Sequence, residues 1–185
     1  MKLIVLSLRC NLKAFNLSKY SMFCEKCQID PTFHSFTPIG SYNGLRYFYT
    51  APSRSKDYTT DGSKLENFKK HVLETEGQPW EWIIDCSDIG SNEPVDVKYI
   101  TGVIKHLSET HDNLLRKVYV IRLNKVIKAA VFVLKKLFKP TLFDRLEYLD
   151  GSPLDLYLQY EKKGFNAKMI KWLNSVDAGK PLPAF

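Results

Sequence analysis

Two cysteines in the order Cys24-x-x-Cys27 have the spacing of a metal half-site. Zinc prefers four tetrahedral nitrogen or sulfur ligands, and Cys10 and His34 are candidates to complete such a set. No second C-x-x-C and no H-x3-H pair accompanies them, and a redox C-x-x-C normally begins a helix after a strand. The four histidines do not cluster in the sequence: His34, His71, His106 and His111. The pattern therefore favours ordinary thiols and surface or helix-end histidines over a zinc site or a redox site, and we predict no metal.

An acidic residue, Asp85, lies near the end of an apolar run at residues 80–86. Catalytic carboxylates of α/β proteins often occupy this position, at the carboxyl end of a strand. No histidine lies nearby in the sequence. The chain also lacks a G-x-G-x-x-G, a Gly-rich phosphate loop, a G-x-S-x-G elbow and an H-E-x-x-H pair. We predict a buried, hydrogen-bonded Asp85 in a protein that is not an enzyme and needs no cofactor.

The segment 115–140 is basic and contains no acidic residue; its charged side chains are Arg116, Lys117, Arg122, Lys125, Lys128, Lys135, Lys136 and Lys139. Large apolar residues, Phe132 among them, share the helix expected within it. Such a helix suits an anionic membrane surface, where each basic residue contributes about 1 kcal/mol. A core-packed helix with a solvated lysine face has the same pattern. Nucleic acid is not expected, because the aromatic residues lie mainly on strands of a covered sheet rather than beside this charge.

Composition is that of a globular protein: 185 residues, 44% hydrophobic and 25% charged, a length that predicts one domain. The formal charge of +7 favours anionic partners. No stretch reaches the roughly 18 uncharged apolar residues that a membrane span requires. Arg9 interrupts the short apolar run at the N-terminus and no cleavage site follows. We therefore expect a short buried strand there, and a cytoplasmic chain with reduced cysteines.

Strands alternate with helices along most of the chain. The strands are expected at 45–50, 80–86, 117–123 and 146–149, and the helices at 63–76, 97–111, 125–138 and 153–164. Right-handed β-α-β crossovers of this kind produce a mostly parallel sheet flanked by helices, so the fold class is α/β. Residues 1–41 show no sustained period and are predicted to be an irregular or short helical extension to a domain at 42–185.

Three passages then point to a known family. Ile83-Ile84-Asp85 ends a strand before a loop with Gly and Ser, residues 114–121 form an aromatic-aliphatic strand after a helix, and Phe138-Lys139-Pro140 precedes the strand 146–149. Their order and spacing resemble the CRAL-TRIO domain, the lipid-binding fold of phosphatidylinositol- and tocopherol-transfer proteins. With the strand at 45–50, the likeness covers roughly residues 42–165.

The resemblance implies a sheet that floors an apolar pocket, closed by a gate helix. The expected pocket residues are Trp82, Ile84, Tyr119, Ile121, Val131, Phe132 and Leu134. Contacts with the membrane or a headgroup are expected from Lys135, Lys136, Phe138 and Lys139. The implied function is non-enzymatic: the protein binds one phospholipid or phosphoinositide and exchanges or presents it, as a cytoplasmic, peripheral membrane protein.

Two departures favour an alternative. After the fourth strand the family usually has a Leu-Pro helix segment and a strand ending in paired glycines, whereas this chain has Gly151-Ser152-Pro153-Leu154. The usual helical N-terminal module is also absent from residues 1–40. Both features resemble the divergent branch that includes BCH domains, which bind small GTPases or their regulators. In that alternative the pocket is filled by the protein's own side chains.

Overall fold

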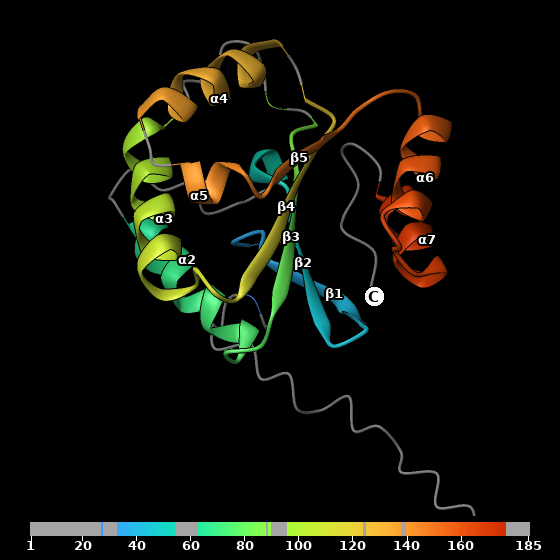
Figure 1. The fold of residues 1–185 in the computed structure, drawn as a ribbon, viewed down its shortest axis with the longest axis horizontal. Helices are drawn as coiled ribbons and strands as arrows, with labels where there is room; N and C mark the ends of the chain where they lie inside the picture. Colours follow the sequence, from blue (N-terminus) through green and yellow to red (C-terminus); the bar gives the residue numbers. More distant parts are fainter. Residues whose placement is uncertain are drawn as a thin grey trace, which may run out of the picture.

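The computed structural model describes residues 27, 33–54, 63–87, 89, 96–123, 125–137 and 140–176. Its centre is a five-stranded sheet in the order β1-β2-β3-β4-β5 (Figure 1). The strands are β1 (Thr37–Tyr42), β2 (Leu45–Thr50), β3 (Trp80–Asp85), β4 (Leu115–Ile121) and β5 (Leu146–Leu149). β1 is antiparallel to β2, and every other neighbouring pair is parallel. The predicted α/β class with a mixed, mostly parallel sheet is confirmed.

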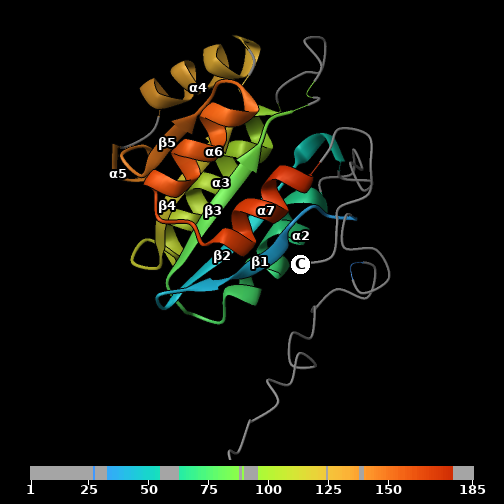
Figure 2. The same ribbon diagram turned by 90° about the vertical axis from the view of Figure 1, so that its right-hand side faces the viewer.

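The parallel strands follow one another in both chain order and sheet order. Right-handed crossovers therefore leave their connecting helices on one face. That face carries α2 (Ser63–Val72), α3 (Val97–Thr110), α4 (Lys125–Leu137) and α5 (Pro140–Phe143), while α6 (Pro153–Lys162) and α7 (Ala167–Ser175) cover the other (Figures 1 and 2). Two short 3-10 helices, η2 (Pro52–Arg54) and η3 (Leu73–Thr75), complete the described elements.

Both faces of the sheet are buried, and each has its own core cluster. Trp82 and Val118 point toward α2 and α3, whereas Ile83 and Tyr119 point toward α6 and α7. Side chains alternate between faces along a strand, so a strand covered on both sides must be apolar nearly throughout. The continuous apolar run predicted for β3 has this cause.

Three of the strands and α-helices differ from the expectation. The short α5 lies between the helix expected at 125–138 and the strand expected at 146–149. β1 lies where irregular or short helical structure is predicted, because Pro38, Gly40 and polar neighbours hide the strand pattern; a bulge between Pro38 and Gly40 at the sheet edge accommodates them. α7 is not anticipated, although Asn166 caps it by accepting a hydrogen bond from the Met169 amide. The strand predicted at the N-terminus lies outside the described residues.

Candidate functional site

The outer side of α4 combines positive charge with an exposed aromatic ring. α4 has 13 residues, none of them acidic. Lys125, Lys128 and Lys135 are exposed on it, and Phe132 between them is 60% exposed. The spacing of these four residues, close to whole helical turns, places them on one stripe. We call this stripe the α4 surface.

Two contacts fix the α4 surface against β5. The Lys128 ammonium donates to Asp150 Oδ2 at 2.7 Å and holds the pKa of that carboxyl below its usual range. The Lys135 ammonium lies 5.2 Å from the centroid of the Tyr148 ring, a cation–π contact. Tyr148 is itself 40% exposed. Phe132 and three lysines of α4 therefore lie together with Tyr148 of β5 along one border of the sheet.

The four residues expected to floor a pocket do not share a face. Trp82 and Ile84 belong to the cluster beneath α2, α3 and α4, whereas Tyr119 and Ile121 pack under α6 and α7. The register explains this, because Ile83 rather than Trp82 pairs with Tyr119, and Asp85 pairs with Ile121. A single floor made of all four residues does not exist in this structure.

The expected gate residues also separate. Val131 is half-buried, but Phe132 points outward and does not line an inner side of α4. Lys135 is exposed. Leu134 and Lys136 belong to α4, but their side chains are outside the described part of the structure, as are Phe138 and Lys139.

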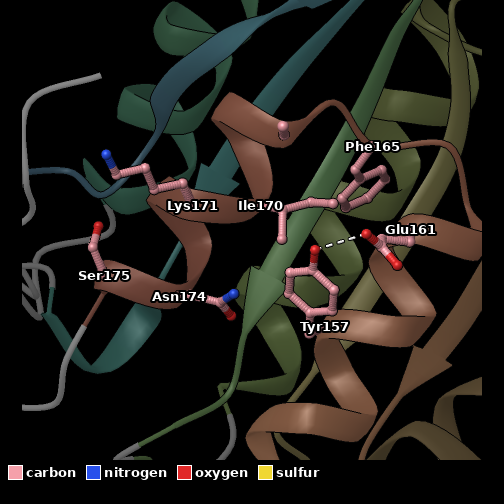
Figure 3. Close-up of a pocket in the computed structure, with 8 residues that line it drawn as sticks. Tyr157, Glu161, Phe165, Ile170, Lys171, Asn174 and Ser175 are labelled. Atoms are coloured by element: carbon pink, nitrogen blue, oxygen red, sulfur yellow. Dashed lines mark hydrogen bonds between the residues drawn. The ribbon is translucent and has the colours of Figure 1, made fainter.

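Apolar side chains of α4 and α5 pack against the sheet. Ile127 of α4 and Leu142 of α5 pack in the same cluster as Val120, Leu123 and Ile84. Two hollows among the described residues involve other elements. One is an open groove of about 660 Å³ between α6 and α7, where Tyr157 donates to Glu161 at 2.7 Å and Ile170 lies beside Phe165 (Figure 3).

Asp85 is fully buried and hydrogen-bonded, as predicted. Its carboxylate accepts from the Tyr49 hydroxyl and from Arg122 Nη1, both at 2.6 Å, and from the Ser87 amide at 2.9 Å. Arg122 has a left-handed φ of 56° and also donates to the Leu173 carbonyl at 3.3 Å. The pair thus ties the carboxyl end of β3 to α7.

A second buried acid follows α2. Glu74 is 8% exposed, and burial raises its pKa to about 7 despite the opposing charge of Arg46. A carboxyl with this pKa is protonated and therefore neutral in mildly acidic solution. As the pH rises it loses its proton and becomes the charged form, which burial disfavours.

Cys27, His34 and His71 form a compact group that we call the Cys27 cluster. Cys27 Sγ lies 3.2 Å from His34 Nδ1 and 3.1 Å from His71 Nε2, and the two nitrogens are 3.3 Å apart. The prediction of separate surface or helix-end histidines is therefore wrong for His34 and His71. His71 was missed because it is 37 residues from His34; its place beside Val72 on the buried side of α2 is the available signal. Cys10 and Cys24 lie outside the described residues.

Comparison with known proteins adds no family. No protein-family model matches the chain, and no curated protein matches it. None of the helices that the structure describes has both the length and the apolar character needed to cross a bilayer.

Proposed function

We propose that this protein is a non-enzymatic lipid-binding module that docks on anionic membranes through the α4 surface. The observation that carries the proposal is Phe132, which is 60% exposed on a helix without acidic residues and is flanked by exposed Lys128 and Lys135. Exposing a phenylalanine to water has no benefit for folding. Inserted at a lipid interface, the ring gains hydrophobic free energy while the lysines attract anionic headgroups.

The resemblance to the CRAL-TRIO family makes α4 the gate of this module. The space for the acyl chains is then between α4 and the sheet, above Ile84, Val120 and Leu123. Because Ile127 and Leu142 occupy part of this space, an outward movement of α4 would make room for a lipid. Membrane docking supplies a reason for that movement, since a ligand that binds the open state more tightly shifts the population toward it.

The pocket of this proposal differs from the one expected from the sequence. Tyr119 and Ile121 face α6 and α7, so they are not part of it, and Trp82 and Ile84 remain. The protein would bind one phospholipid or phosphoinositide and exchange or present it, as a cytoplasmic protein that associates peripherally with membranes.

A protein-interaction module of the BCH type is the second candidate. It is favoured by an exposed apolar stripe on α6, where Leu154, Tyr157 and Leu158 are spaced for one helical face. The packing of Ile127 and Leu142 beneath α4 also agrees with this candidate. Its partner would be a small GTPase or a GTPase regulator that covers the α6 stripe.

Native mass spectrometry of the chain purified from cells distinguishes the two candidates. A lipid adduct, with transfer of labelled phospholipid between vesicles that fails in Ile127→Trp, supports the lipid-binding module. Leu73→Trp, a change at an exposed position, serves as the control for the added bulk. Absence of a lipid adduct and of transfer contradicts the lipid-binding module. Saturable binding of a purified GTPase that is lost in Leu154→Asp would then favour the second candidate.

A further inference from the structure

The Cys27 cluster brings three metal-binding atoms together from separate parts of the chain. Cys27 and His34 precede β1, and His71 lies in the last turn of α2. Cys27 is 3% and His71 2% exposed, while His34 is half-buried. Polar groups are rarely buried face to face unless a hydrogen bond or a cation joins them.

Hydrogen bonds alone cannot satisfy this triangle. His71 Nδ1 lies 2.6 Å from the Asn67 carbonyl, which only accepts, so the ring carries its proton on Nδ1. Neutral His71 then directs a lone pair from Nε2 toward Cys27 and His34. The triangle consists of Cys27 Sγ, His34 Nδ1 and His71 Nε2, and each of its edges is one contact between two of these atoms. At most two hydrogens are available for the three contacts: the thiol hydrogen and one hydrogen on His34 Nδ1. At least one edge, between 3.1 and 3.3 Å long, therefore holds no hydrogen.

A metal ion resolves all three edges at once. Zinc bonds of ~2.3 Å to sulfur and ~2.0 Å to nitrogen at tetrahedral angles place the ligand atoms about 3.3–3.6 Å apart. The observed separations are within a few tenths of an ångström of that range. The bond from His71 Nδ1 to a backbone carbonyl is also the usual outer contact of a zinc-bound histidine, because it fixes the tautomer and the ring orientation.

We propose that Cys27, His34 and His71 bind one Zn²⁺ ion through Sγ, Nδ1 and Nε2. Cys27 loses its thiol proton to solvent on binding, and water or a further side chain supplies the fourth ligand. The burial of Cys27 and His71 favours a structural role for the ion. The ion links the segment before β1 to α2. Close to the cluster, the ring of Phe36 stacks on the ring of Phe48 in β2, with 4.8 Å between the ring centroids. The segment before β1 therefore also packs against the core.

Zinc analysis of the full chain is the first test. Protein purified without added chelator should hold about one zinc per chain, and apoprotein should regain it in competition with a chromogenic chelator. Cobalt bound in place of zinc should give a thiolate-to-metal charge-transfer band. Because changing an outer contact already costs about 10–100-fold in affinity, loss of a direct ligand in Cys27→Ser or His34→Gln should cost at least as much. Cys86→Ser and His106→Gln, outside the cluster, are the matched controls and should bind as the wild type does.

The proposal is overturned if the wild-type chain binds no zinc against the chelator, or if the cobalt band persists in Cys27→Ser. A measurement on the wild-type chain keeps the proposal testable if Cys27→Ser does not fold. Alkylation mapped by mass spectrometry should modify Cys27 at least tenfold faster after chelation and leave the rate at Cys86 unchanged. Equal Cys27 rates with and without chelator would contradict zinc ligation.

Discussion

The Cys27 cluster and the α4 surface are opposites in construction. The cluster is largely buried and joins two chain segments that lie 37 residues apart, whereas the α4 surface is exposed and lies within 13 consecutive residues. Burial couples a group to folding, because its contacts are lost when the chain unfolds. Exposure couples a group to partners instead. Changes in the cluster should therefore alter stability, and changes on the α4 surface should alter membrane binding while the fold persists.

The largest effect is expected from reversing charge on the α4 surface. Changing Lys125, Lys128 and Lys135 together to Glu should lower affinity for phosphatidylserine or phosphoinositide vesicles at least a hundredfold at low salt. Three lysines at about 1 kcal/mol each give about 3 kcal/mol, and reversal adds repulsion. Flotation with vesicles measures the change. The sequence alone assigns the same role to Lys135, Lys136 and Lys139, whose triple reversal should act similarly.

A matched triple separates location from net charge. Lys98 and Lys105 of α3 and Lys171 of α7 are also exposed, and changing them to Glu alters the net charge equally. This control should retain most of the vesicle affinity of the wild type. Equal losses in the two triples would mean that only overall charge matters, with no specific role for the α4 surface.

The stability of the folded chain should depend on pH through the buried side chain of Glu74, which follows α2. Its pKa is about 7 in the folded chain and 4.5 unfolded, so the folded state binds more protons between these values. This contribution to stability is full below pH 4.5 and is lost as the pH rises through 7, by about 3 kcal/mol in all. Denaturant unfolding of Glu74→Gln should show a smaller decline than the wild type, the remainder coming from buried Glu81, whose pKa is also raised by burial, whereas exposed Glu109→Gln should keep the full decline. A decline of the same size in Glu74→Gln would assign it to other groups.

Zinc removal should destabilise the wild type somewhat less. A ligand present at 100 times its dissociation constant stabilises the folded chain by about 2.7 kcal/mol. Thermal unfolding with and without chelator should show this difference in the wild type and in Cys86→Ser, but not in His34→Gln. Vesicle binding should not change, because the α4 surface is a separate element. A chelator effect of equal size in His34→Gln would place the zinc elsewhere.

The smallest of these effects belongs to a single ring. Phe132→Ala should weaken vesicle binding by about 1.5–2 kcal/mol, the value of burying a phenylalanine, or roughly tenfold to thirtyfold. The loss should persist at high salt, unlike that of the lysine triple, because apolar burial is not screened. Leu73→Ala, at a position 59% exposed, is the control. An unchanged affinity in Phe132→Ala would remove the ring from the docking surface.

The contrast between the α4 surface, which lies in one helix, and the Cys27 cluster, which joins separate segments, also explains which features can be predicted from the sequence. Local periodicity predicts β2, β3, β4, β5 and the helices α2, α3 and α4 between them, because each pattern is contained in one element. It also identifies α4 as basic and apolar. Periodicity fails where the position of a side chain depends on neighbours that are distant in the sequence. Trp82 and Tyr119 lie on opposite faces of the sheet because of the register between β3 and β4, which no local pattern fixes. Phe132 faces solvent rather than the sheet. His71 joins Cys27 across 44 residues, and only the packing of α2 brings them together.

Docking through the α4 surface is tested most directly by a tryptophan placed at its centre. The native residues Trp80, Trp82 and Trp172 are all buried, so a Phe132→Trp variant adds the one exposed indole. On anionic vesicles its emission should shift to shorter wavelength and be quenched by brominated acyl chains, whereas a Leu73→Trp variant should show neither change. Vesicle-bound protein in which the Phe132→Trp indole remains unshifted and unquenched would contradict the proposed docking surface.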